Sequence, residues 1–135
     1  MEYRTFGRSG LKVSAIGYGC MTFGDPALGA MDQAAVEGMV GTLHGAGVNF
    51  FDHSEAYGGT NRGAPEVMFG EAVRSLGIKR SDLVVSSKIF NHYNNVGLGP
   101  NEIGLSRKHL REGMAALSCS YLKPALVRAR NQSPT

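Results

Sequence analysis

The 135-residue sequence has little cysteine, no long hydrophobic run and no histidine or cysteine pairs at metal-ligand spacing. Cys20 and Cys119 are too few for a disulfide scaffold. With no signal-peptide pattern, we expect a reduced, cytoplasmic protein. No apolar stretch approaches the roughly 20 residues that span a bilayer, so membrane insertion is not expected. The missing ligand spacing likewise predicts no metal site.

Acidic residues are absent from the C-terminal segment, residues 118–135, which contains Lys123, Arg128 and Arg130. These three residues account for the formal net charge of +3, because residues 1–117 hold 11 basic and 11 acidic side chains. The basic character therefore belongs to the tail, and nucleic acid is not an expected partner. Hydrophobic residues make up 42% and charged residues 19%, which is typical of a globular domain.

Glycine is abundant, with 19 residues, and it separates segments of different periodicity. Apolar residues at helical spacing predict helices over residues 32–46, with Asp32 as N-cap, from Pro65 to residue 76, and from Ser106 to residue 117. Apolar or alternating runs predict strands. The predicted strands are a hairpin of residues 3–6 and 11–13, a buried strand end at 14–19, and strands at 48–52 and 82–90.

Strands that alternate with helices predict a parallel sheet of right-handed units. Two α/β architectures fit this order: an open doubly wound sheet and a (β/α)₈ barrel. No G-x-G-x-x-G follows the first strand, which disfavours an open dinucleotide-binding sheet.

Three polar residues stand near the C-terminal ends of predicted strands: Asp52, Tyr57 and Lys88. In a parallel α/β barrel these ends share one face, where active sites lie. An ammonium near a phenol stabilises the phenolate, and an aspartate keeps the ammonium in place. Such a tyrosine can act as a proton donor to a carbonyl oxygen. The alternative is structural, since single polar residues are common at strand ends.

The segments "VNFFDHSEAYG", "SSKIF" and "GLSRKHLREGM", with the opening "YRTFGRSGLKVSAIGYG", resemble the aldo-keto reductase superfamily. The similarity is to the branch of bacterial aldehyde reductases and voltage-gated potassium channel β-subunits. It covers residues 3–117 and implies a (β/α)₈ TIM barrel with NADPH as cofactor. Asp52, Tyr57 and Lys88 match three of four catalytic positions, with Tyr57 as proton donor. Cys20, Met21 and Asp52 match cofactor-side positions.

Residues 118–135 depart from the family pattern, and a fourth strand carrying the remaining catalytic residue is not recognisable there. We therefore expect an N-terminal barrel portion over residues 1–117, followed by an irregular basic tail. A barrel of this type needs about 250 residues. The expected fold is an incomplete (β/α)₈ barrel, a hairpin plus about three β/α units. We expect such a chain alone to bind NADPH too weakly to measure, and to associate, including with homologous chains, or to unfold.

Three functions remain open at this point. The first is a reductase of small aldehydes or ketones, inactive on its own. The second is a non-enzymatic partner similar to a channel β-subunit, and the third is a non-functional product. Among the histidines, His53 is expected to have a structural role, and His109 is expected to be exposed. His92 and Tyr93 lie in the loop on the substrate side of a full barrel, and lining the pocket is the less favoured interpretation of them.

Overall fold

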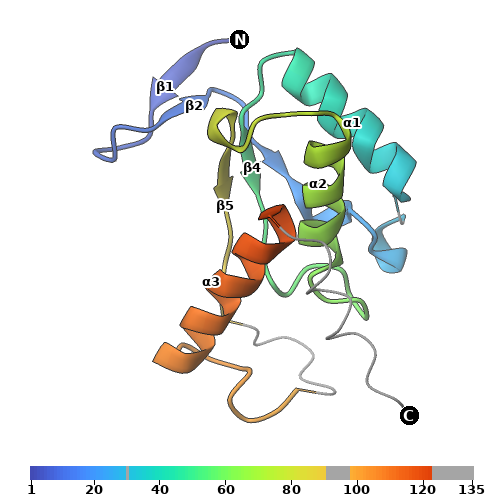
Figure 1. Ribbon diagram of the computed structural model, residues 1–135, viewed down its shortest axis with the longest axis vertical. Helices are drawn as coiled ribbons and strands as arrows, with labels where there is room; N and C mark the ends of the chain where they lie inside the picture. Colours follow the sequence, from blue (N-terminus) through green and yellow to red (C-terminus); the bar gives the residue numbers. More distant parts are fainter. Residues whose placement is uncertain (30, 91–97, 123–135) are drawn as a thin grey trace.

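The computed structural model describes residues 1–29, 31–90 and 98–122 (Figure 1). Strands and helices alternate after an N-terminal hairpin, as the sequence predicts. The strands are β1 (Tyr3–Thr5), β2 (Lys12–Ser14), β3 (Tyr18–Gly19), β4 (Phe50–Asp52) and β5 (Val84–Ser86). The helices are α1 (Gln33–Gly45), α2 (Ala64–Ser75) and α3 (Arg107–Leu122), with short 3₁₀ turns at Cys20–Thr22, Pro26–Leu28 and Arg80–Asp82.

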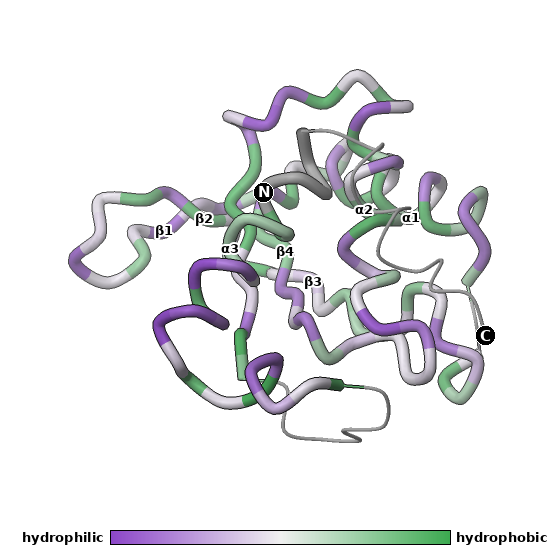
Figure 2. The backbone as a smooth tube through the Cα atoms, turned by 60° about the horizontal axis from the view of Figure 1, so that its bottom comes forward, coloured by the Kyte–Doolittle hydropathy of each residue, from purple (hydrophilic) through white to green (hydrophobic). Residues whose placement is uncertain are grey.

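The main sheet contains β3, β4 and β5 in that order, and both pairings are parallel. Asp52 lies opposite Gly19 on one side and Ser86 on the other. The carboxyl ends of all three strands therefore meet at one edge of the sheet. In Figure 2 the backbone changes from hydrophobic to hydrophilic colours as β4 gives way to the following segment. The polar residues at the carboxyl ends of these strands, such as Asp52 and Ser86, therefore lie together at one edge of the sheet.

The core forms between the sheet and the helices. Phe51 of β4 and Phe69 of α2 are fully buried, with ring centroids 4.7 Å apart. Burying one such side chain contributes about 1.5–3 kcal/mol. Helix α2 packs against both α1 and α3, so it is the central helix. The buried cluster comprises Cys20, Phe23, Val36, Val40, Val48, Phe51, Phe69, Ala72, Val73 and Leu83.

The helix starts follow the local chemistry of the sequence. The Asp32 carboxylate accepts a hydrogen bond from the Ala35 amide at 2.8 Å, which confirms the predicted N-cap of α1. Pro65 lies in the first turn of α2, where its missing N–H costs nothing. Ser106 precedes α3, and its hydroxyl accepts from the His109 amide at 3.1 Å.

The hairpin β1–β2 extends away from the rest of the chain (Figures 1 and 2). It is attached at its base to the chain entering β4. The Asn49 side chain accepts from the Ser14 amide at 2.7 Å and donates to the Lys12 carbonyl at 3.0 Å. The Phe6 ring also lies 5.7 Å from the Phe50 ring. The Asn49 side chain therefore connects β2 to the chain before β4 by two hydrogen bonds of the kind that a neighbouring strand would make.

Three predicted boundaries differ from the structure. Residues 14–19 were expected as one buried strand end, but Ser14 ends β2 opposite Tyr3, and β3 is limited to Tyr18–Gly19. Ile16 lies between the two strands and is exposed, because the Ser14 hydroxyl bonds to the Ile16 carbonyl and turns the chain. The strand expected over residues 82–90 is limited to β5, since a 3₁₀ turn precedes it. Helix α3 includes residues 118–122, so the predicted irregular tail begins in a helix.

Candidate active site

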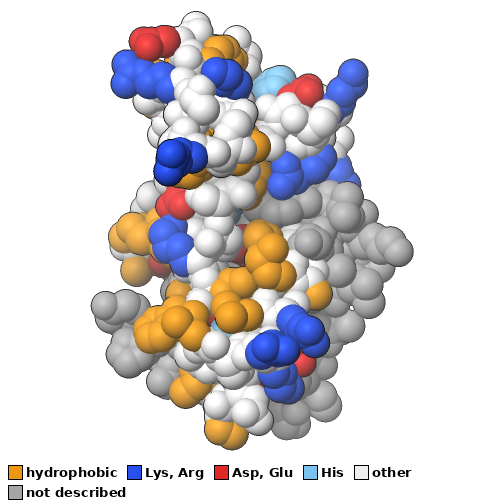
Figure 3. Space-filling view, turned by 90° about the vertical axis from the view of Figure 1, so that its left-hand side faces the viewer, with side chains coloured by type: hydrophobic (Ala, Val, Ile, Leu, Met, Phe, Trp, Pro, Cys, Tyr) orange, Lys and Arg blue, Asp and Glu red, His pale blue; other side chains and the backbone are white. Residues whose placement is uncertain are grey.

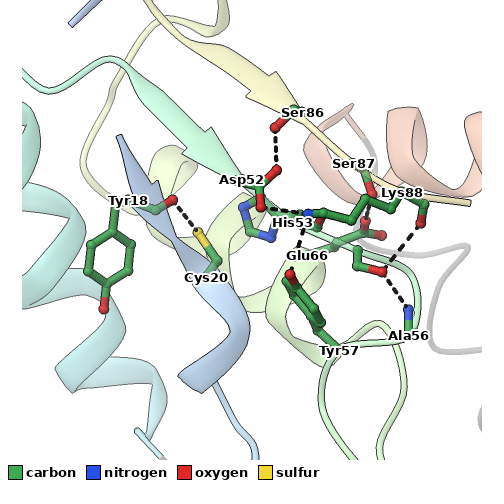
Figure 4. Close-up of polar contacts among 11 residues, drawn as sticks. Tyr18, Cys20, Asp52, His53, Ala56, Tyr57, Glu66, Ser86, Ser87 and Lys88 are labelled. Atoms are coloured by element: carbon green, nitrogen blue, oxygen red, sulfur yellow. Dashed lines mark hydrogen bonds and ion pairs between the residues drawn. The ribbon is translucent and has the colours of Figure 1, made fainter. Parts of the chain in front are cut away.

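Lys88 is the centre of the site at the carboxyl edge of the sheet (Figure 4). Its ammonium donates to Asp52 Oδ2 at 2.5 Å and to Tyr57 Oη at 3.3 Å. The same nitrogen lies 5.1 Å from the centroid of the Tyr57 ring. Lys88 therefore contacts both of the other residues that the sequence predicts as a catalytic set, although the three come from separate segments.

Asp52 is the last residue of β4, and it has a second partner. The Ser86 hydroxyl donates to Asp52 Oδ1 at 2.6 Å, across the pairing of β4 with β5. Each carboxylate oxygen therefore has a donor, one a hydroxyl and one an ammonium. This arrangement orients the carboxylate toward Lys88 and leaves it few other conformations.

Lys88 lies two residues beyond β5, and both its side chain and its backbone are attached to the chain after β4. Its ammonium also donates to the His53 carbonyl at 2.8 Å. Its own carbonyl accepts from the Glu55 amide at 3.2 Å and from the Ser54 hydroxyl at 3.4 Å. The lysine is thus positioned at both ends, which explains how a long exposed side chain keeps one direction.

Tyr57 is positioned by a tight turn between β4 and α2. Its amide donates to the Ser54 carbonyl at 3.1 Å, and its carbonyl accepts from the Gly63 amide at 3.0 Å. Gly58 follows with a φ of +101°, in the left-handed region. A Cβ atom there would lie 2.3 Å from the Asn61 carbonyl oxygen, so only glycine fits.

The charges in the site stabilise one another. Partial burial acts to raise the pKa of Asp52, but hydrogen bonds from Lys88 and Ser86 and the Lys88 charge outweigh it and lower the pKa below 3.8. For Lys88, desolvation acts to lower the pKa, and the contacts with Asp52 and Tyr57 raise it above 10.5. The site therefore holds a carboxylate and an ammonium at neutral pH.

This arrangement can donate a proton. The Tyr57 hydroxyl is the group with a transferable proton, and the ammonium beside it stabilises negative charge on the phenol oxygen when that proton leaves. The Lys88 and Asp52 side chains are 53% and 38% exposed, so an incoming molecule can reach the edge where they lie.

The two predicted cofactor contacts from the β3 turn differ in position. Met21 is exposed, whereas Cys20 is fully buried, and its thiol faces the Tyr18 carbonyl at 3.8 Å (Figure 4). Burial, reinforced by the Asp52 charge, raises the pKa of the Cys20 thiol, which keeps it uncharged. The structure therefore brings Met21, and not Cys20, to the molecular surface.

The histidine predictions have mixed outcomes. His53 has the predicted structural role: it is fully buried, with its ring 4.9 Å from Phe69. The prediction that His109 is exposed is wrong. It is buried because the first turn of α3 packs onto the chain after β4, where His109 Nε2 lies 2.8 Å from Glu55 Oε1. His92 and Tyr93 lie outside the described residues.

The sequence reasoning did not find four residues next to the site. These are Ser86, which bonds to Asp52, and the group Glu55, Glu66 and Ser87. The Ser87 hydroxyl donates to the buried Glu66 carboxyl at 2.7 Å, and burial raises the pKa of that carboxyl. Closeness in sequence to Asp52 or Lys88 could have indicated Glu55, Ser86 and Ser87. Glu66 lies in α2 and reaches Ser87 only through the fold, so no local pattern could have indicated it.

This chain is similar to known proteins over most of its length. The family model described as "Aldo/keto reductase family" matches residues 15–122. A rice (Oryza sativa subsp. japonica) protein named "Probable voltage-gated potassium channel subunit beta" is 46% identical over 115 residues, which cover 84% of this chain and 32% of the relative. An Arabidopsis thaliana protein of the same name is 44% identical over 117 residues, covering 86% and 32%.

A solved structure shows the same fold. An aldo-keto reductase from Bacillus halodurans, in its holo form, superimposes with a TM-score of 0.68 at 23% identity, covering 90% of this chain and 36% of that chain. The chain thus spans about a third of the length of the relatives it matches. The predicted fold class, an incomplete (β/α)₈ barrel, is confirmed, because the chain superimposes on part of this aldo-keto reductase and three of the described strands form a parallel sheet without closing a barrel. The chain belongs to the aldo/keto reductase family.

Proposed function

We propose that this chain carries the proton-donating part of an NADPH-dependent reductase of small aldehydes and ketones. The observation that carries the proposal is the contact of Lys88 with both Asp52 and Tyr57 at the exposed edge of the sheet. Membership of the aldo/keto reductase family supports an oxidoreductase. The cofactor and the substrate class are our proposals.

The residues present fit the nicotinamide end of such a cofactor. Gly19 lies opposite Asp52 in the sheet, and a Cβ added there would meet no atom within 4 Å, so the space beside Asp52 is open. Asp52 and Met21 would border this space. When bound, NADPH supplies a hydride to the carbonyl carbon. Tyr57 donates its hydroxyl proton to the carbonyl oxygen, and Lys88 stabilises the phenolate that remains, which yields an alcohol.

We further propose that the 135 residues alone neither bind NADPH measurably nor complete the reaction. The main sheet has three described strands, and none of them lies beyond β5. The space beside Asp52 is therefore not enclosed as it would be in a closed barrel. The open edge also admits water, which weakens each electrostatic contact in the site. Fluorescence titration of the purified chain with NADPH tests this part, and micromolar binding at a stoichiometry near one would contradict it.

The chemistry is tested in a chimera, in which residues 1–117 replace the matched segment of the Bacillus halodurans reductase. NADPH oxidation with 4-nitrobenzaldehyde is the assay, and the parent enzyme is the positive control. We expect the chimera to be active and Tyr57→Phe to lower kcat by about a hundredfold or more. A folded chimera whose activity survives Tyr57→Phe would contradict the proposed proton donor.

A second function is favoured by the names of the relatives. Two proteins at 46% and 44% identity are named as potassium channel β-subunits, so an interaction role with a homologous or channel partner is a distinct proposal. Co-purification with the full-length rice relative tests it. Tyr57→Phe separates the two functions, because it removes proton donation and leaves an interaction surface elsewhere unchanged.

A further inference from the structure

Two chain segments run side by side past the ends of β4 and β5, and each carries one catalytic candidate. Residues 53–57 carry Tyr57, and residues 86–90 carry Lys88. The His53 amide donates to the Ser86 carbonyl at 2.8 Å, and the Glu55 amide donates to the Lys88 carbonyl at 3.2 Å. The parallel pairing thus continues beyond the strands, and it determines how far Tyr57 lies from Lys88.

The Glu55 side chain adds a second link between these segments. Its Oε1 atom accepts a hydrogen bond from the Phe90 amide at 2.8 Å and lies 2.8 Å from His109 Nε2. The side chains are only 18% exposed for Glu55 and 8% for His109. A hydrogen bond to a charged group in such a place is stronger than a surface pair, and its loss leaves a costly unpaired group.

Helix α3 supplies His109, the residue that contacts the Glu55 carboxylate. His109 lies in its first turn, where the Ser106 cap holds the helix start. One turn later stands Gly113, and a Cβ there would lie 3.1 Å from the Ile89 side chain. The helix therefore lies close to the two residues that follow Lys88, directly at Ile89 and through the shared partner Glu55 at Phe90.

We propose that Glu55, held by His109, is a positioning residue that keeps the segment carrying Tyr57 in register with the segment carrying Lys88. This inference deepens the proposed function and rests on it for its catalytic meaning. Glu55 does not touch the reacting atoms. Its effect is on the contact between the Tyr57 hydroxyl and the Lys88 ammonium, 3.3 Å apart.

The test uses NMR of the full chain and needs no turnover. The readouts are the nuclear Overhauser effect between the Tyr57 ring and the Lys88 Hε protons, and the pKa of Lys88 from its ¹³Cε shift. Glu55→Ala should weaken the nuclear Overhauser effect between Tyr57 and Lys88. It should also lower the pKa of Lys88, because the ammonium loses its contact with the Tyr57 hydroxyl. Exchange of the Phe90 amide should become about tenfold faster. Glu55→Gln should preserve all three, since its carbonyl oxygen still accepts.

A matched pair tests the partner. His109→Ala should weaken the Tyr57–Lys88 contact, and His109→Gln should restore it, because the glutamine amide can donate from a similar place. Glu2→Ala removes an exposed carboxylate of the hairpin and is the control for charge loss alone. If Glu55→Ala does not fold, the His109 pair decides: loss with rescue supports the proposal, and an unchanged contact overturns it.

Two results would overturn the inference outright. An unchanged contact in folded Glu55→Ala would show that Glu55 does not position Tyr57. An equal loss in Glu55→Gln and Glu55→Ala would show that charge, and not position, is what matters. Failure of the proposed function would look different, since an inactive chimera leaves these readouts in place.

Discussion

At the scale of single residues, Asp52 and Lys88 form an ion pair that is partly open to water. An exposed pair of this kind contributes only about 0–1 kcal/mol to folding. Its value is orientation: Asp52 directs the ammonium toward Tyr57. The pairing favours the folded state above the ordinary pKa of Asp52, and this contribution is lost as pH falls through the lowered value.

The first prediction concerns this pair. Lys88→Met should raise the pKa of Asp52, because the ammonium that stabilises its carboxylate is gone while the desolvation remains. Titration of the Asp52 ¹³Cγ shift by NMR measures it. Lys12→Met is the control, since the Lys12 ammonium bonds to the Thr5 hydroxyl in the hairpin, away from Asp52. An unchanged Asp52 pKa in Lys88→Met would contradict the pairing.

The second prediction concerns His53. Its burial lowers its pKa to about 3, so the folded protein keeps it neutral while the unfolded chain protonates it below pH 6.5. Between these values the unfolded state binds more protons, and stability must fall as pH falls. The free energy of unfolding should drop by up to about 1.4 kcal/mol per pH unit.

Urea denaturation at several pH values measures this slope. His53→Phe should flatten it, because phenylalanine fills a similar volume and has no proton to bind. If the slope between pH 6 and 4 is the same in His53→Phe, other groups cause the acid sensitivity and the buried neutral state of His53 is wrong.

At the scale of elements, the connection from β4 to α2 depends on a glycine. The third prediction is that Gly58→Ala destabilises the chain by more than about 2 kcal/mol, because φ is +101° and the new Cβ would meet the Asn61 carbonyl. Gly38→Ala is the control: it lies in α1 with nothing within 4 Å, and it should stabilise by about 0.5–1 kcal/mol. Thermal unfolding of both variants gives the comparison, and similar effects would contradict this reason.

The elements also show what the sequence could predict. Helical spacing and caps located α1, α2 and α3, and the strand ends located Asp52, Tyr57 and Lys88, because these signals are local. The burial of His109 and the role of Glu55 could not be predicted in this way. They arise from α3 packing on a segment more than 50 residues earlier, which no local pattern encodes.

At the scale of the whole molecule, the sheet has an unpaired edge. β5 pairs only with β4 within residues 1–29, 31–90 and 98–122. Figure 3 shows hydrophobic side chains gathered on the face below the hairpin. The exposed large hydrophobic residues from β5 onward, through α3, are Phe90, Leu105, Leu110 and Met114. None of the described helices is both long and apolar enough to cross a bilayer.

The fourth prediction is that the free edge of β5, with the exposed hydrophobic residues from Phe90 to Met114, causes copies of this chain to associate. An exposed edge with adjacent apolar side chains favours contact with a second chain. Leu105→Lys with Met114→Lys should shift the protein toward monomer in sedimentation velocity runs over a range of concentrations. Ile16→Lys is the control, because Ile16 is 61% exposed and precedes β3. An equal shift in the control would mean that general hydrophobicity, and not this region, causes association.

Lys88 is attached to the chain after β4 through both its ammonium and its carbonyl, and this has a consequence for how the chain can change in length. Adding or deleting one residue between Ser86 and Lys88 would displace both attachments at once and point the lysine to the opposite face. The length of that segment is therefore fixed by the two attachments of Lys88. The turn at Arg8 and Ser9 has no such restriction, so insertions should accumulate at the hairpin tip while the spacing after β5 stays constant.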